Sequence, residues 1–428
     1  MMEINKHNFY SYFLPLLFVS FIFNLNGDLL GFPNFITTQR LLFLFFLFLS
    51  YFILTNLRIH IPRDVLKILL ISLFSLIFFM GISTFIFSPN SMISFSSVIS
   101  NSFFWLTLVI FSILFFSLKI TFTDILVQRF VTVTVVTSFF VLIFTWWITI
   151  VNIGININNY FILRTEFNSF FPMGLNRYLT GLIFLNIFNL PILLKLILVN
   201  KRISKLALIT FVLLLFLVLL LGSRQNLLFL IVYTIVLFCV FILTNRKTNK
   251  FAKIIKSSFF LLGILIFMTL ISTKTFLGKW IFERVFETTA NQIDSSDGIR
   301  EQNLRIGLEY IKDYPFRGYG PNQFYNLTLN STHPHNGFIN LAVGYSSVAL
   351  VLLTALLIVI FFRSIRQLRN DVSESAFLKP FHFTLLSFCM TFYFISNLFN
   401  DVIEEYSFWI LLLIILKLQV LKEGKLKL

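Results

Sequence analysis

The sequence predicts an all-α polytopic membrane protein with about 12 transmembrane helices and one large extracytoplasmic loop that contains an amphipathic helix. Of the 428 residues, 57% are hydrophobic and only 12% are charged, and the mean hydropathy is +0.89. Such a chain has too few polar side chains to cover a water-soluble surface. Apolar runs of about 20 residues, enough for a helix to cross a bilayer, recur along its length. They lack the alternation that a transmembrane barrel requires.

The apolar runs divide the chain into three parts. Residues 1–272 hold transmembrane helices 1–9, residues 273–336 form the large extracytoplasmic loop, and residues 337–428 hold transmembrane helices 10–12 and a cytoplasmic tail. The predicted spans are residues 9–27, 40–57, 65–87, 98–118, 125–150, 173–199, 205–221, 225–244, 254–272, 337–362, 381–398 and 405–421. An even number of spans places both termini on one side of the membrane.

The distribution of basic residues indicates which side that is. With the N-terminus in the cytosol, 23 of the 34 Lys and Arg residues fall in cytosolic segments. Seven of the other 11 lie in the large loop, which the positive-inside rule discounts because long segments cross regardless of charge. Both termini are therefore predicted to be cytoplasmic. The net charge of +16 follows from this topology and from contact with lipid head groups, so no nucleic-acid partner is implied.

The sequence holds no cofactor motif. Cys239 and Cys389 fall inside predicted spans, away from any C-x-x-C pattern, so neither a disulfide framework nor a metal cluster is expected. Asp294 and Asp297 in the large loop are interpreted as turn and cap residues rather than as a cation site. A P-loop, H-E-x-x-H and G-x-S-x-G are all absent, so nothing favours a nucleotide hydrolase, a zinc protease or a serine hydrolase.

One helix is predicted within the large loop. Asp297-Gly298 offers a start, Pro315 stops it, and Leu304, Leu308 and Ile311 recur between them at helical spacing. We therefore predict an amphipathic helix over residues 299–313, near the outer interface of the membrane.

Two arginines on this helix are predicted to have opposite surroundings. Arg300 falls in line with Leu304 and Leu308 on the apolar seam, whereas Arg305 has Glu301 and Glu309 four residues to either side, as in ordinary surface ion pairs. A guanidinium on an apolar seam needs an anionic partner, and a lipid-linked phosphate would serve. The alternative is that Arg300 extends to a carboxylate or a lipid head group.

Arg224 is a second candidate for binding an anion. It lies in a tight outer turn, Gly222-Ser223-Arg224, between two very apolar spans, with no acidic residue near it in sequence. At such a depth an arginine either reaches water as an interfacial anchor or binds an anion.

The third candidate is the pair His333 and His335, which precedes the apolar run that begins at Gly337. Asn336 is a plausible N-cap, so both histidines lie beside the positive end of a helix, where imidazole tends to stay neutral and able to accept a proton. That suits a general base. A structural loop role and a metal site are the alternatives, but the other three histidines belong to the cytosolic side and cannot complete a metal site.

Three segments, in this order, resemble the bacterial O-antigen polymerase and O-antigen ligase superfamily of membrane glycosyltransferases. They are Gly222-Ser223-Arg224, the stretch from Arg300 to Gly320, and His333-Pro334-His335-Asn336. The resemblance implies that Arg224 and Arg300 bind the diphosphate of an undecaprenyl-diphosphate-linked oligosaccharide. It also implies that His335, with His333 beside it, is the catalytic histidine region. Leu304 stands where the family often has Trp.

The resemblance implies a metal-independent enzyme without a cofactor, in the bacterial inner (cytoplasmic) membrane. Its partners would be the lipid-linked oligosaccharide, an acceptor glycan, membrane lipid and a possible chain-length regulator. We expect a polysaccharide polymerase that transfers glycan to a sugar hydroxyl on the outer face of the membrane. The alternatives are an O-antigen ligase that transfers glycan to lipid A-core, a lipid-linked oligosaccharide flippase or other transporter, and a non-catalytic assembly scaffold.

Overall fold

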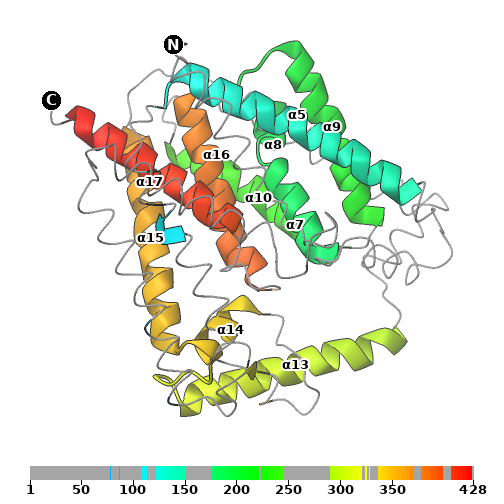
Figure 1. The fold of residues 1–428 in the computed structure, drawn as a ribbon, viewed down its shortest axis with the longest axis vertical. Coiled ribbons are helices and arrows are strands. Elements are labelled where there is room, and N and C mark those ends of the chain that lie inside the picture. The colour runs from blue at the N-terminus through cyan, green and yellow to red at the C-terminus, as the bar shows by residue number, and fades with distance from the viewer. Residues whose placement is uncertain are drawn as a thin grey trace, which may run out of the picture. The chain divides into compact units, whose positions relative to one another are not determined.

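The computed structural model describes seven main stretches of the chain, and all of the regular structure in them is helical (Figure 1). They are residues 122–150, 175–220, 223–244, 290–320, 336–370, 377–398 and 406–426, with isolated residues elsewhere. For residues 175–177, 220, 224, 290–300, 406–407 and 420–426 the description extends to the helix and not to the side chains. The predicted spans at 9–27, 40–57, 65–87, 98–118 and 254–272 lie outside the described residues, apart from isolated positions.

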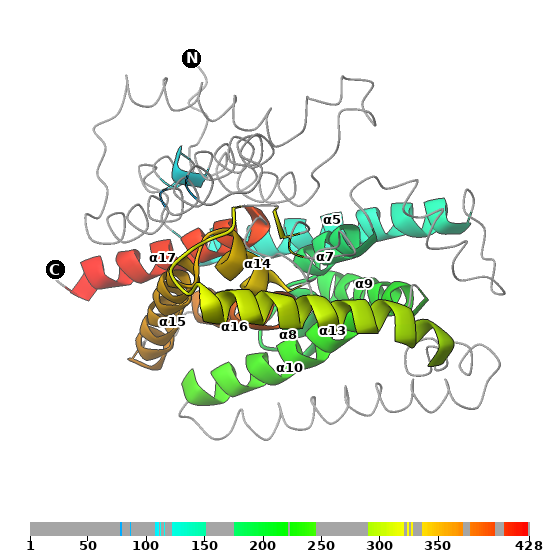
Figure 2. The same cartoon turned by 90° about the horizontal axis from the view of Figure 1, so that it is seen from below.

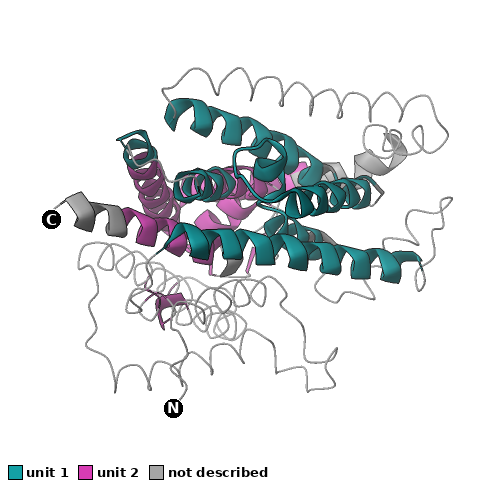
Figure 3. Cartoon of the chain, turned by 90° about the horizontal axis from the view of Figure 1, so that it is seen from above, with its two compact units in different colours: residues 1–38, 120–289, 365–388 teal, residues 39–119, 290–364, 389–428 magenta. Residues whose placement is uncertain are grey.

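The chain divides into two compact units (Figure 3). Unit 1 comprises residues 1–38, 120–289 and 365–388, and unit 2 comprises residues 39–119, 290–364 and 389–428.

Unit 1 is a bundle built around α5 (Asp124–Ile148), which packs against α7 (Leu175–Leu185) and α9 (Lys201–Leu220). Thr123 caps α5, since its hydroxyl accepts the backbone N–H of Leu126 at 3.2 Å. The indole N–H of Trp146 donates to the Leu213 carbonyl, which ties α5 to α9.

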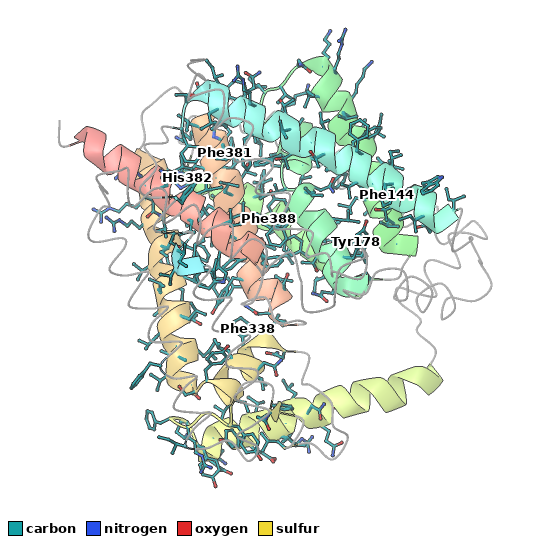
Figure 4. The ribbon with its side chains drawn as sticks, viewed as in Figure 1. Phe144, Tyr178, Phe338, Phe381, His382 and Phe388 are labelled. Carbon is teal, nitrogen blue, oxygen red and sulfur yellow. The ribbon has the colours of Figure 1, made fainter. Side chains whose placement is uncertain are left out.

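Aromatic rings hold the rest of unit 1 together. α10 (Arg224–Thr244) meets α16 (Leu378–Thr391) where the Phe229 and Phe388 rings lie 5.3 Å apart. Phe388 also meets Phe184 at 4.9 Å, and Phe381 stacks on Phe188 at 5.5 Å. Figure 4 labels Phe381 and Phe388 on α16. Such ring pairs add to the energy of burial.

The predicted span at 173–199 is wrong as a single helix. It is broken into α7 and a short α8 (Asn189–Leu193), followed by a loop. Asn186 donates its side-chain amide back to the Leu182 carbonyl, and the Tyr233 hydroxyl donates to the Ile187 carbonyl at 2.9 Å. The Leu182 carbonyl also accepts the backbone N–H of Asn186. In a continuous helix the Ile187 carbonyl would pair with residue 191, but Pro191 has no N–H, so the Tyr233 hydroxyl supplies the donor, which is how a broken helix is tolerated inside an apolar bundle.

Unit 2 contains α13 (Ala290–Asp313), α14 (Gly337–Gly344), most of α15 (Ser347–Asn370), a π-helical turn at Phe392–Ser396 and α17 (Tyr406–Leu426). The Tyr393 hydroxyl, on the π-helical turn, shares a hydrogen bond of 2.7 Å with Thr354. Its ring meets that of Phe338 at 5.6 Å. This tyrosine therefore links the π-helical turn to both α14 and α15.

The predicted span at 337–362 begins at Gly337 as expected, but it is interrupted. α14 ends at Gly344 and α15 starts at Ser347, after Ser346 takes a φ of 149°. The Ser346 side chain then accepts the backbone N–H of Ala349, so a hydroxyl replaces the missing helical bond. Hydropathy averaged over a span does not reveal this break, because the residues on both sides are predominantly apolar.

Five helices in the described parts of the chain are long and apolar enough to cross a membrane. They are Asp124–Ile148, Lys201–Leu219, Gln225–Thr244, Ser347–Asn370 and Leu378–Ser396. Four coincide closely with predicted spans, and the fifth is the longer part of the interrupted one. The predicted span at 405–421 corresponds to α17, whose apolar stretch is shorter, at Phe408–Gln419. Its residues from Phe408 to Leu418 are buried. These helices confirm a multi-pass, all-helical membrane protein.

Candidate functional site

The helix of the large loop is longer than predicted. α13 ends at Asp313, as expected before Pro315, but it begins at Ala290. Asp297-Gly298 therefore lies inside the helix, and its interpretation as a start was wrong. No proline interrupts residues 290–313, and each of the two glycines there, Gly298 and Gly307, costs the helix only about 1 kcal/mol relative to alanine.

The packed face of α13 also differs from the predicted seam. Leu304 and Leu308 are 37% and 53% exposed, whereas Asn303, Gly307 and Tyr310 are buried. The prediction followed the most apolar stripe, which is where a soluble helix would pack. The close contact with α14 forms instead at the smallest residue, Gly307, where the backbone of α13 can approach the Ile339 side chain.

α13 packs against α14 through this face, as two views of unit 2 show (Figures 1 and 2). Tyr310, Phe324, Ile339 and Val343 form a buried apolar cluster between them. At Gly307 the backbone of α13 comes so near that an added Cβ would lie 2.5 Å from the Ile339 side chain.

The turn that follows α13 is held from several sides. The backbone N–H of Ser347 donates to the Pro315 carbonyl at 3.2 Å, and that of Tyr319 donates to the Val343 carbonyl. The Arg317 guanidinium lies over the Tyr314 ring, 5.1 Å from its centroid. These contacts tie the end of α13 to the end of α14 and the start of α15.

Tyr310 is the buried centre of this turn. Its ring lies 5.2 Å from that of Tyr314 and 5.3 Å from that of Tyr319. Burial raises the pKa of Tyr310 to about 12, although nearby Arg317 opposes the shift by favouring the charged form. Tyr310 therefore stays neutral at physiological pH.

Asn336 caps α14 as predicted. Its side-chain oxygen accepts the backbone N–H groups of Phe338 and Ile339, each at 3.1 Å. The preceding N–H, that of Gly337, donates to the Asn397 carbonyl at 2.7 Å. His333 and His335 lie outside the described residues, but the residue that directly follows His335 is anchored by these bonds.

Arg224 is the first residue of α10. Just before it, the Ser223 carbonyl accepts the N–H of Leu227, and the Ser223 hydroxyl accepts the side-chain amide of Asn226. A cation in the first turn of a helix opposes the helix dipole, so helix stability does not explain an arginine there, whereas an anion would be favoured.

The candidate residues fall in both units. Arg224 belongs to unit 1, while residue 300 on α13 and the Asn336 cap belong to unit 2. Arg305 forms the predicted ion pair with Glu301 at 3.5 Å, and the two side chains are 71% and 73% exposed. Within the described residues, no group of three His, Cys, Asp or Glu side chains is placed to hold a metal ion.

Gly307 was overlooked in the sequence. The available signal was its position, since it follows Arg300 by seven residues, which is two helical turns, and precedes Tyr310 by three. Residue 300 therefore occupies the same side of α13 as Gly307. Arg305, two residues before Gly307, occupies the other side. Residues 300 and 305 therefore still lie on different sides of α13, although the packed face is not the apolar seam that the sequence predicted.

Comparison with known protein families identifies one domain. Residues 209–345 match the Wzy_C family, described as O-antigen ligase, over about a third of the chain. No curated protein sequence matches the chain. The matched stretch runs from α9 to the end of α14 and contains Arg224, Arg300, His333 and His335. Proteins of this family are membrane enzymes that transfer glycans in polysaccharide synthesis. Residues 209–345 are therefore an O-antigen ligase family domain, as the three sequence motifs indicated.

Proposed function

We propose that this protein is a polysaccharide polymerase of the bacterial inner membrane. It would transfer a glycan from undecaprenyl diphosphate to a sugar hydroxyl of an acceptor glycan on the outer face, and so extend an O-antigen, capsule or exopolysaccharide. Both termini would lie in the cytoplasm, as the distribution of Lys and Arg favours.

The chemistry requires few groups. The bond between the anomeric carbon and the diphosphate oxygen breaks, and a bond from that carbon to the acceptor oxygen forms. His335 would accept the proton of the acceptor hydroxyl, with His333 beside it. Arg224 and Arg300 would bind the diphosphate and stabilise the negative charge that it gains as it leaves. No step needs a metal ion.

One observation carries the proposal. α13, the helix that contains Arg300, packs directly on α14, whose N-cap residue Asn336 follows His335 in the chain. This contact joins two segments that the sequence motifs select independently, and both fall within the matched family domain. The position of Arg224 at a helix N-terminus adds support, because that end of a helix favours an anionic ligand.

The decisive experiment offers purified protein two acceptors. A labelled undecaprenyl-diphosphate-linked repeat unit is supplied either with more of the same compound or with lipid A-core. We expect a ladder of lengthening products with the lipid-linked acceptor and release of undecaprenyl diphosphate. Transfer to lipid A-core alone would identify an O-antigen ligase instead, which is the activity that the description of the matched family names.

A transporter is tested in the same preparation. Movement of labelled lipid-linked glycan across proteoliposomes without any new glycosidic bond would contradict the polymerase and support a flippase.

For the proposed base, His335→Ala should abolish transfer without lowering the amount of protein in the membrane, and His333→Ala should be milder. Normal polymer from His335→Ala would refute the assignment and would be the result expected of a scaffold.

A further inference from the structure

Gly307 lies where α13 comes nearest to α14. A Cβ built on this residue would meet the Ile339 Cγ2 atom at 2.5 Å and the Phe324 ring at 3.2 Å. The first distance is shorter than carbon atoms tolerate, so even alanine would force the Ile339 side chain or one of the two helices to shift. The two helices are thus as close as a residue without a side chain allows.

Neither helix propensity nor backbone conformation explains a glycine at this position. Glycine weakens the interior of a helix relative to alanine, because it loses more conformational freedom on folding. Among the described residues the glycine with a positive φ is Gly320, so Gly307 has a φ that any residue adopts. What remains is the close contact between α13 and α14.

This contact is one end of a short chain of interactions. Ile339, which meets Gly307, has its own backbone N–H held at 3.1 Å by the side-chain oxygen of Asn336. Asn336 directly follows His335 in the chain. In the other direction, residue 300 lies two turns before Gly307 on the same helix. Gly307, Ile339 and Asn336 therefore connect the two segments that carry Arg300 and His335.

We propose that Gly307 is a positioning residue that sets the distance between α13, the helix that carries Arg300, and the start of α14, the helix that directly follows His335. The proposal rests on the proposed function, in which one of these residues binds the diphosphate and the other accepts the proton. Displacement of reacting groups by about 1 Å can lower the rate of a positioned reaction by about 100-fold. A methyl group at residue 307 would cause a displacement on this scale while leaving both functional side chains intact.

The test compares Gly307→Ala with the wild type in the transfer assay, with rates expressed per folded molecule. Folded protein is measured by fluorescence-detected gel filtration and by the melting temperature. We expect kcat to fall at least about tenfold with little change in KM, because the groups are misplaced rather than removed. A merely structural role would lower the amount of folded protein and leave kcat per folded molecule unchanged, and that result would overturn the proposal.

A second substitution identifies the contact responsible. Ile339→Leu removes the Cγ2 methyl that Gly307→Ala would meet and keeps the volume of the side chain. The double variant should regain most of the wild-type kcat, and Ile339→Leu alone should be near normal. The matched control is Gln302→Ala on an exposed position of the same helix, which should leave kcat unchanged.

If Gly307→Ala yields no folded protein, the other end of the link is tested with Asn336→Ala and Asn336→Ser. Serine can still cap α14 and alanine cannot. A low kcat in the alanine variant with a near-normal kcat in the serine variant supports the proposal, and equal rates in both overturn it.

Failure of the proposed function and failure of the positioning role give different results. If the wild type itself shows no transfer, the proposed function has failed. If the wild type transfers glycan and Gly307→Ala has the same kcat, only the positioning role has failed.

Discussion

At the scale of single residues, Arg300 and Arg305 provide the sharpest comparison, because they are five residues apart on one helix. Arg305 is exposed and pairs with Glu301 at 3.5 Å. Residue 300 lies on the side of α13 that packs against α14, in register with Gly307. Two residues of identical chemistry are thus expected to differ in function solely because of their positions on the helix.

We predict that Arg300→Ala lowers transfer by about 100-fold or more, since in the proposed function it removes a charge that would stabilise the leaving diphosphate. Arg300→Lys should recover little activity, because an ammonium group cannot reproduce a bidentate guanidinium contact. Arg305→Ala should stay near normal, because an exposed ion pair contributes only a few tenths of a kcal/mol. Polymer length and yield in a strain that lacks the native enzyme measure these effects, with membrane levels checked by blotting. The reverse order of effects would show that Arg305, and not Arg300, binds the diphosphate.

Tyr310 leads to a prediction about alkaline pH. Because its pKa is raised from 10.0 to about 12, the unfolded chain loses this proton at a lower pH than the folded protein does. The corresponding stability is present in full below pH 10 and declines as the pH rises toward 12. The melting temperature of the purified protein should therefore fall over this range, and Tyr310→Phe should show a shallower fall. Identical slopes for the two proteins would contradict the prediction.

At the scale of secondary-structure elements, the long apolar helices were the most predictable. The spans predicted at 125–150 and 225–244 correspond closely to α5 and α10. Uninterrupted apolar stretches in lipid have no alternative to helix, since every backbone group must be paired internally. The breaks at 186–188 and 345–346 were missed, because the hydroxyls of Tyr233 and Ser346 replace helical hydrogen bonds there.

The first of these breaks can be tested by Tyr233→Phe. The substitution removes the hydroxyl that donates to the Ile187 carbonyl and keeps the ring that packs against Phe229 and Phe388. Leaving a buried carbonyl without its donor costs about 1–3 kcal/mol, so the melting temperature should fall. Tyr314→Phe, at a residue that is 47% exposed, is the matched control and should change little. An equal melting temperature for both variants would show that the bond does not stabilise the break.

At the scale of the whole molecule, the reaction is predicted to be independent of metal ions. The sequence places only two histidines beside each other in the large loop, and neither has a matching third ligand nearby. Transfer should therefore persist in excess EDTA at an undiminished rate. Activity that disappears on chelation and returns with a divalent ion would overturn the metal-free mechanism.

The sequence by itself determined the class of the molecule and the identity of its domain. Composition and apolar runs of membrane-spanning length predict a helical membrane protein, and three short motifs indicate the family that residues 209–345 match. Both signals are local, since they depend on what each segment contains and not on its neighbours in space. The N-cap at Asn336 and the ion pair between Arg305 and Glu301 were predictable for the same reason.

Only the tertiary structure decided which face of α13 is buried and which residue sets its distance from α14. The sequence pattern favoured Leu304 and Leu308, but the packed face holds Asn303, Gly307 and Tyr310. Hydropathy ranks residues by their cost of exposure to water, whereas helices approach one another most closely where side chains are smallest. For that reason a glycine that no motif selects lies at the contact between the helix of Arg300 and the helix that follows His335.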